Sequence, residues 1–265
     1  MHNFQFHNPT RICFGRGEIA TIADQIPQTA RVLVLYGGGS IRQNGVYEQL
    51  QQALANHQWQ AMPGVSPNPQ YEQLMQAVEL VRREQLDFVL AVGGGSVIDG
   101  GKFVAAAACY EGSDPWDLLA KGEPVLSALP LGCVLTLPAT GSESNPVSVI
   151  SRGKAKLSFR SPKVQPRFAV LDPSVTFSLP PRQIGNGVVD AFVHVLEQYL
   201  TYPVGGDVQD RLAEGLLMVL RDNGPRALKE PDNSEVRANI MWAASLALNG
   251  LIGRGVPQDW SCHAI

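Results

Sequence analysis

Two patterns of hydrophobic and polar positions alternate over the first two thirds of the chain. Short, continuous apolar runs predict buried strands at residues 31–36, 87–92, 133–137 and 168–171. Between them, apolar residues spaced three or four apart predict helices over 44–56, over 70–85 and through the alanines at 105–108. Strands that are apolar throughout and alternate with helices are typical of a parallel sheet covered on both faces. We therefore expect an α/β fold with a mostly parallel sheet.

The pattern changes after Pro180 and Pro181. No strand signal follows, and helical spacing predicts helices over 182–201, 207–222 and 234–252. We therefore expect two domains, an α/β domain at residues 1–178 and an all-helical domain at residues 179–265.

Two predicted strands end in the same short sequence, Gly-Gly-Gly-Ser, at residues 37–40 and 93–96. We expect a helix to follow residues 93–96. Backbone N–H groups at a helix N-terminus can bind a phosphate group, and glycines allow the phosphate to come close to the backbone. Ser96 and Asp99 also have the spacing of a helix capping box. At residues 37–40 there is no acidic side chain of the kind that binds the ribose 2′-hydroxyl of NAD, which favours NADP. Turns without a ligand are the alternative at both places.

Asp190 and His194 lie four residues apart in an apolar stretch that we expect to be helical. This spacing places both side chains on one face, where they can reach one divalent metal ion. Taken alone, the pair has a simpler explanation. Asp190 would interact with the dipole at the helix N-terminus, and His194 would be a core histidine with its hydrogen bonds made inside the protein. His263 is a candidate third ligand. The hydroxyl-rich loop at residues 136–145 can bind ribose and diphosphate oxygens, although such loops are also ordinary turns.

Composition excludes several classes of protein. The net charge of −3 over 265 residues offers no basic surface, so we expect no nucleic acid and no anionic membrane as partner. No run of 18 apolar residues predicts a membrane span. The four cysteines form no Cys-x-x-Cys pair, and the first residues have no signal-peptide pattern, so we expect reduced thiols in the cytoplasm.

Together these motifs resemble the iron-containing (group III) alcohol dehydrogenase family, in particular its bacterial NADPH-dependent aldehyde reductases and butanol dehydrogenases. The resemblance covers the whole chain and lies in segments 93–99, 136–143, 188–197 and 249–260. It implies a dehydroquinate-synthase-like architecture, with a dinucleotide-binding α/β domain, a helical metal-binding domain and a catalytic site between them. It also implies hydride transfer between NADP(H) and an aldehyde or primary alcohol, and a homodimer.

The resemblance also implies roles for single residues. Asp190, His194 and His263 match three of the family's four ligands for a divalent metal, with iron or zinc expected before nickel or manganese. The positions that fall in cofactor-contacting segments are Gly38, Gly39, Ser40, Asn68, Gly94, Gly95, Ser96, Asp99, Thr136, Thr140, Asn145 and Lys156.

One feature departs from the family's pattern. The fourth ligand is a histidine that lies beyond the position of Ile265, and the family's helical domain continues further. We therefore expect an incomplete helical domain in this chain. The alternatives are an inactive cofactor-binding fragment and a member that resembles glycerol dehydrogenases.

Overall fold

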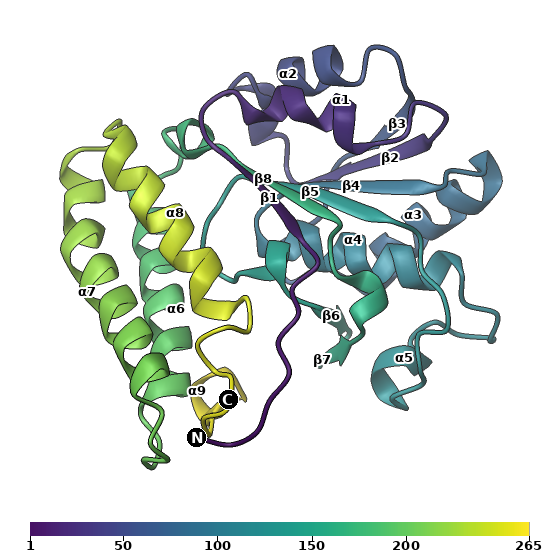
Figure 1. Cartoon of the computed structure of the whole chain (residues 1–265). Helices are drawn as coiled ribbons and strands as arrows, with labels where there is room; N and C mark the ends of the chain where they lie inside the picture. Colours follow the sequence, from purple (N-terminus) through teal and green to yellow (C-terminus); the bar gives the residue numbers. More distant parts are fainter. Residues whose placement is uncertain (265) are drawn as a thin grey trace. The chain divides into compact units, whose positions relative to one another are not determined.

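The computed structural model describes residues 1–264 (Figure 1). Contacts within the chain divide it into two units. The α/β unit comprises residues 9–136 and 146–172, and the helical unit comprises residues 1–8, 137–145 and 173–265. This division differs from a single boundary at residue 178, because two early segments without helical periodicity belong to the helical unit.

A parallel sheet organises the α/β unit, as the apolar runs predict. In the described part of the chain it has six strands in the order β1-β8-β5-β4-β2-β3, and every neighbouring pair is parallel. Central strand β4 is buried along its whole length, which explains its uninterrupted apolar run. The strands are β1 Arg11–Phe14, β2 Arg31–Tyr36, β3 Gln58–Met62, β4 Phe88–Gly93, β5 Leu131–Leu135 and β8 Phe168–Leu171.

Strand β5 begins and ends two residues before the predicted run at 133–137. Gly132 interrupts the apolar pattern there, so the start of the strand is hidden in the sequence. A Cβ atom at Gly132 would lie 2.3 Å from the ring of Phe168, which pairs with Gly132 in the neighbouring strand. The glycine therefore makes room for an aromatic ring on the sheet.

Helices cover both faces of this sheet, with α1 and α2 on one side and α3 and α4 on the other (Figure 1). Helix α3 buries Leu74, Val78 and Val81 on one face, as its spacing predicts. The helices of this unit are α1 Ile22–Gln25, α2 Val46–Ala53, α3 Tyr71–Glu84, α4 Gly95–Ala108 and α5 Asp117–Ala120.

An antiparallel hairpin, β6 (Val147–Arg152) and β7 (Ala155–Arg160), packs against α4. The fully buried Lys102 donates a hydrogen bond of 2.6 Å from Nζ to the carbonyl of Val147. The backbone N–H of Val149 donates to Oδ2 of Asp99 at 3.0 Å. Two charged side chains of α4 therefore fix the position of the hairpin.

The proposed capping box at the start of α4 is wrong. The helix begins at Gly95, its N-cap is Gly94, and no side chain of the described residues caps it by a hydrogen bond. Ser96 therefore lies inside the first turn and not at the cap. The carboxylate of Asp99 is used by the hairpin and does not reach back to the cap.

Three long helices pack side by side in the helical unit (Figure 1): α6 Pro181–Tyr199, α7 Asp207–Lys229 and α8 Ser234–Leu248. Small side chains at their contacts, among them Ala191, Ala213 and Ala244, allow close approach. Helix α7 runs past its predicted end at 222 because Ala227 still packs on the core. No helix within residues 1–264 is long and apolar enough to cross a membrane.

Candidate metal and cofactor site

Helix α6 places Asp190 and His194 one turn apart on the same face, as predicted. A proline in its first turn is compatible with the unpaired N–H groups there. Asp190 is half-buried and His194 is only 4% exposed. Oδ2 of Asp190 lies 3.9 Å from Nδ1 of His194.

His263 comes to this face of α6 from a short terminal helix, α9 (Ser261–Ala264). Its Nε2 lies 3.5 Å from Oδ1 of Asp190, and its ring stacks on that of His194 with 4.3 Å between centroids. One ligand atom from each of the three residues lies within 4.8 Å of the other two. The structure therefore brings together three residues that span more than seventy positions of the sequence.

The chemistry of this cluster fits a divalent metal ion. Bonds of about 2.1 Å to a tetrahedral ion place ligand atoms about 3.4 Å apart. The three ligand atoms lie within 4.8 Å of one another, and Nε2 of His263 is 3.5 Å from Asp190. Nδ1 of His194 is buried and has no hydrogen-bond partner among the described residues, a costly state unless something else binds it. Burial lowers the pKa of His194 more than Asp190 raises it, so the ring stays neutral and keeps its lone pair. The backbone of Ala139 raises the pKa of this ring and so offsets part of the effect of burial.

Glu197, one turn beyond His194 on α6, is a residue of the site that sequence reasoning did not assign. It is 7% exposed, and its Oε2 accepts a hydrogen bond from Nδ1 of His263. Its Oε1 accepts from the backbone N–H groups of Cys262, at 2.6 Å, and of His263, at 3.3 Å. Burial raises the pKa of Glu197, but these hydrogen bonds outweigh burial and lower it, so the carboxylate is ionised.

The phosphate-binding candidate lies where strand β4 meets helix α4. A Cβ atom at Gly93 would lie 2.5 Å from Cγ2 of Val97, so only glycine lets the first turn of the helix pack on the end of the strand. The backbone N–H of Thr136 donates to the carbonyl of Gly93 at 3.0 Å, which brings the end of β5 next to this turn. The first N–H groups of α4, at Gly95 and Ser96, have no preceding carbonyl within the helix to bind. This is the geometry that a phosphate group requires.

The loop at residues 37–40 has one charged neighbour that the sequence did not single out. Arg42 follows Ser40 by two residues, in the 3₁₀ turn Ser40–Arg42. Its Nε and Nη2 donate to the hydroxyl of Tyr36 at 2.9 and 2.7 Å, and its guanidinium lies 4.2 Å from the ring centre of Tyr47. The hydrogen bond with Tyr36 raises the pKa of Arg42, so the positive charge is secure. A cation that is held beside this loop attracts anionic groups.

The other expected cofactor residues are divided between the units. Asn68 and the exposed Lys156 lie in the α/β unit, and Asn68 has a φ of 52° that asparagine tolerates. Thr140 and Asn145 lie in the helical unit. Nδ2 of Asn145 donates to the carbonyl of Gly141 at 2.8 Å, so this amide stabilises its own loop. A cofactor contact by any of these residues remains a prediction.

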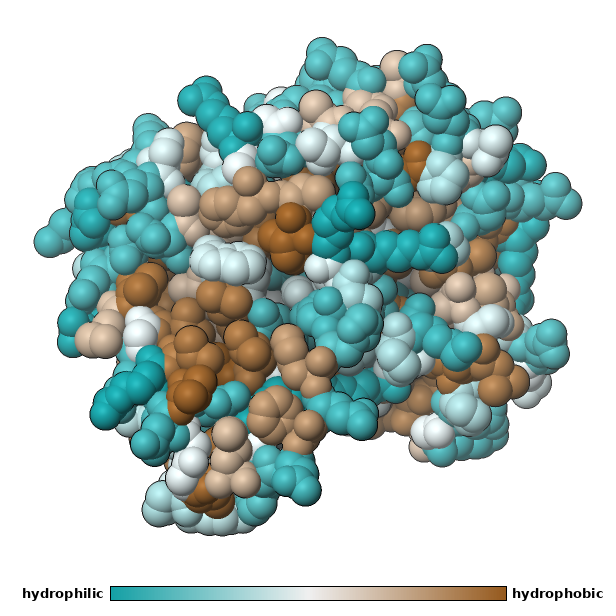
Figure 2. Space-filling model, in the orientation of Figure 1, coloured by the Kyte–Doolittle hydropathy of each residue, from teal (hydrophilic) through white to brown (hydrophobic). Residues whose placement is uncertain are grey.

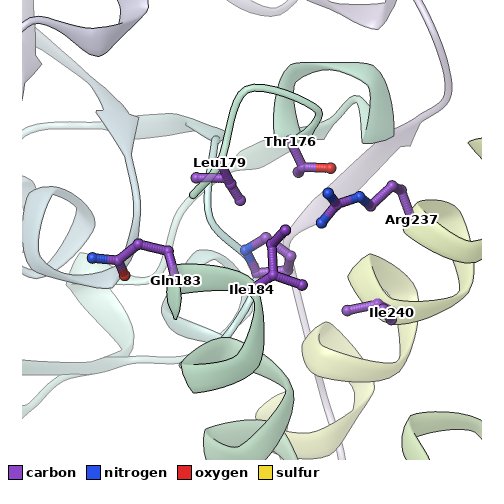
Figure 3. A pocket seen from close by; sticks show the side chains of 7 residues that line it. Thr176, Leu179, Gln183, Ile184, Arg237 and Ile240 are labelled. Carbon is purple, nitrogen blue, oxygen red and sulfur yellow. The ribbon is translucent and has the colours of Figure 1, made fainter. Parts of the chain in front are cut away.

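A small cavity lies in the helical unit beside Arg237 (Figure 3). Its volume is about 10 Å³, room for about one water molecule, which excludes it as a site for an aldehyde or a nicotinamide. The guanidinium points into the cavity toward the hydroxyl of Thr176 (Figure 3). Arg237 is 3% exposed, and its Nη2 has no hydrogen-bond partner in residues 1–264. Burial lowers the pKa of Arg237, and Asp232 offsets part of that effect.

Comparisons with known proteins give a consistent result. Residues 9–173 match the family model of iron-containing alcohol dehydrogenases, and residues 185–265 match the C-terminal model of the Fe-containing alcohol dehydrogenase family. The chain is 59% identical to the NADPH-dependent aldehyde reductase YqhD of Escherichia coli, over all of the chain and 70% of that protein. It is 41% identical to a probable NADH-dependent butanol dehydrogenase of Bacillus subtilis, over all of the chain and 70% of that protein.

Solved structures agree. A crystal structure of E. coli YqhD superimposes with a TM-score of 0.97 at 59% identity, covering 99% of this chain and 68% of the other. NADH-dependent butanol dehydrogenase A of Thermotoga maritima superimposes with a TM-score of 0.95 at 42% identity, covering 99% and 67% of the two chains. The expected fold class, a parallel α/β sheet followed by a helical unit, is confirmed.

Proposed function

The chain belongs to the iron-containing alcohol dehydrogenase family, and from that premise we propose that it is a metal-dependent oxidoreductase that reduces aldehydes to primary alcohols with NADPH. The observation that carries the proposal is the convergence of Asp190, His194 and His263 around a buried imidazole nitrogen that has no partner in residues 1–264. When bound, the divalent metal supplies a Lewis acid for the carbonyl oxygen and the nicotinamide supplies the hydride.

The residues of the chain prepare this site for a metal ion. Asp190 supplies an anionic oxygen ligand, and His194 and His263 supply neutral nitrogens, a set that suits iron or zinc. Burial of His194 excludes water from one side of the cluster, which strengthens the electrostatic effect of the site.

The loop at residues 37–42 supports NADPH over NADH as the cofactor. Family membership does not decide this point, because relatives of both kinds match the chain. The loop has no carboxylate to repel a 2′-phosphate, and Arg42 adds a fixed positive charge. The first turn of α4, next to Gly93, would bind the diphosphate.

We also propose that the protein works in the cytoplasm as a homodimer. Support for association comes from large apolar side chains that are exposed on the helical unit, where Figure 2 shows apolar surface gathered. Val189, Leu200 and Val208 are each more than 60% exposed. Contiguous apolar surface is typical of a protein interface. Light scattering on the purified chain tests this: a monomer at micromolar concentration would contradict it.

The test of the activity is NADPH oxidation with butanal, measured with the metal-free chain and after addition of Fe²⁺ or Zn²⁺. We expect turnover that depends on the metal. His194→Ala should abolish it, whereas His7→Ala, an exposed histidine of the same unit, should not. Full activity without metal would refute the metal mechanism. NADPH binding without turnover at any metal concentration would favour the inactive cofactor-binding alternative.

A further inference from the structure

Glu197 connects helix α6 to the terminal segment, residues 259–263, through more bonds than any metal ligand makes with that segment. Its main-chain carbonyl accepts from the N–H of Asp259 at 2.8 Å. Its carboxylate accepts from the N–H groups of Cys262 and His263 and from Nδ1 of His263. Both carboxylate oxygens of Glu197 therefore accept hydrogen bonds from the terminal segment, which contains the third candidate ligand, His263.

These bonds determine which nitrogen of His263 is available. A carboxylate only accepts hydrogen bonds, so the contact with Glu197 requires the proton of the neutral ring to be on Nδ1. Nε2 then carries the lone pair, and Nε2 is the atom that lies 3.5 Å from Asp190. The ring cannot rotate without breaking the bond to Glu197. Trp260 limits the other side, with its ring 5.8 Å from that of His263 and nearly perpendicular to it.

We propose that Glu197 is a positioning residue that fixes the tautomer and orientation of His263, so that Nε2 faces Asp190 and His194 as a ready metal ligand. Carboxylate–histidine pairs act in this way at metal sites, and loss of such a partner typically lowers metal affinity about 10–100-fold. The inference rests on the proposed metal-dependent function. It adds a fourth residue of α6 and α9 to the site, one that never contacts the metal.

The competing explanation is that Glu197 only anchors the terminal segment. The chain offers a matched control for this explanation. Oδ1 of the exposed Asp259 accepts from the N–H of Ser261 at 3.0 Å and from its hydroxyl at 2.5 Å, and so holds the same segment without contacting His263. Asp259→Ala loosens the segment, whereas Glu197→Gln keeps the size of the side chain and removes the charge that selects the tautomer.

The first measurement uses the metal-free chain. Nitrogen-15 NMR of the imidazoles, at a pH where the rings are neutral, distinguishes protonated from unprotonated nitrogens, and His263→Gln assigns the signal. We expect Nδ1-protonated His263 in the wild type and in Asp259→Ala, and a mixture of tautomers in Glu197→Gln. An unchanged Nδ1-protonated ring in Glu197→Gln would overturn the proposal, and so would a mixture in the wild type.

The second measurement is Zn²⁺ affinity by competition with a chromophoric chelator. We expect Glu197→Gln to bind about 10–100-fold more weakly than the wild type, and Asp259→Ala to stay within a few-fold. Glu197→Asp keeps the charge on a shorter side chain, so its Zn²⁺ affinity should lie between those of the wild type and Glu197→Gln. It replaces Glu197→Gln in this test if that variant folds poorly. Equal losses in Glu197→Gln and Asp259→Ala, or no loss in either, would overturn the proposal. A wild-type chain that binds no zinc would instead refute the metal-dependent function itself.

Discussion

Replacing Gly187 by alanine should destabilise the helical unit, although alanine is the better helix former. Gly187 and Gly185 lie two residues apart on helix α6, and both have ordinary helical geometry. A Cβ atom at Gly187 would lie 2.4 Å from the carbonyl oxygen of Pro138, far inside the contact distance. At Gly185, no described atom lies within 4 Å of the added Cβ. The two glycines therefore separate the effect of helix propensity from the effect of packing.

The magnitudes follow from these two effects. Gly→Ala in a helix interior stabilises by about 0.8–1 kcal/mol. Forcing a carbon atom into a packed contact costs about 1–3 kcal/mol, and the atom at Pro138 is backbone, which cannot rotate away. Because the contacted atom is backbone, we take the upper part of that range, about 2–3 kcal/mol, for Gly187. We therefore expect Gly185→Ala to stabilise by up to about 1 kcal/mol and Gly187→Ala to destabilise by a net of about 1–2 kcal/mol. For a chain of this size, that loss lowers the melting temperature by about 2–8 °C.

Thermal unfolding followed by circular dichroism measures both changes under the same conditions. Zinc affinity gives a second readout, because Pro138 precedes Ala139, whose backbone influences the pKa of the His194 ring. Displacing Pro138 should therefore also weaken metal binding, and Gly185→Ala should leave it unchanged. If Gly187→Ala melts at or above the temperature of the wild type, as Gly185→Ala should, the close approach of α6 to Pro138 does not exist and the reasoning fails.

Three further predictions concern single side chains. Gly38 has an ordinary φ and open space for a Cβ in the described structure, so Gly38→Asp should fold normally. Its negative charge should raise the KM for NADPH relative to that for NADH, whereas the neutral Gly38→Asn should not. Equal KM ratios in the two variants would contradict the charge argument. Arg237→Met removes Nη2, which has no partner in residues 1–264, but also the 2.9 Å hydrogen bond from Nε to the carbonyl of Pro231. The two effects oppose each other, so the melting temperature should stay within about 4 °C of wild type, and a larger fall would mean that Nη2 is satisfied in solution. Burial and the hydrogen bond to Asp114 raise the pKa of Tyr71 to about 12 from 10.0, so the stability that its neutral form provides is present below pH 10 and lost as the pH rises toward 12. The stability difference between wild type and Tyr71→Phe should therefore shrink over that interval, and a difference that stays constant would contradict the assigned pKa.

The central strands could be predicted because burial on both faces leaves a continuous apolar run, as in β2 and β4. The edge strands could not. Strand β3, Gln-Trp-Gln-Ala-Met, has no fully buried residue, so polar and apolar side chains are mixed along it. The hairpin strand β7 is mostly exposed and carries Lys156 and Arg160. The position of the whole hairpin depends on the buried contact of Lys102 with Val147 of β6, which no local pattern reveals.

The candidate site was predictable to the extent that it is local. Asp190 and His194 share a helix face by their spacing alone. His263 was a candidate by residue type alone, and only the family resemblance singled it out, because nothing in its sequence distance indicates that it approaches α6. The arrangement of Glu197 with His263 is a tertiary contact between residues 66 positions apart, and Glu197 by itself is an unremarkable carboxylate on a helix. The charge of Arg42 beside the loop at 37–40 depends on its contacts with Tyr36 and Tyr47, which spacing does not show.

The order of segments in the two units has a consequence for how the chain can be cut and made. The backbone passes from one unit to the other after Asn8, Thr136, Asn145 and Asp172. During synthesis the α/β unit is complete once Asp172 has been added. The helical unit can fold only after its last helices have been made, although two of its segments, residues 1–8 and 137–145, are synthesised much earlier. Excising residues 173–265 would leave α8 without Glu143, which bonds to Ser245, and without Asn8, which bonds to the carbonyl of Asn249. A metal-binding miniprotein taken from this chain therefore has to be assembled from three pieces, with the first eight residues among them.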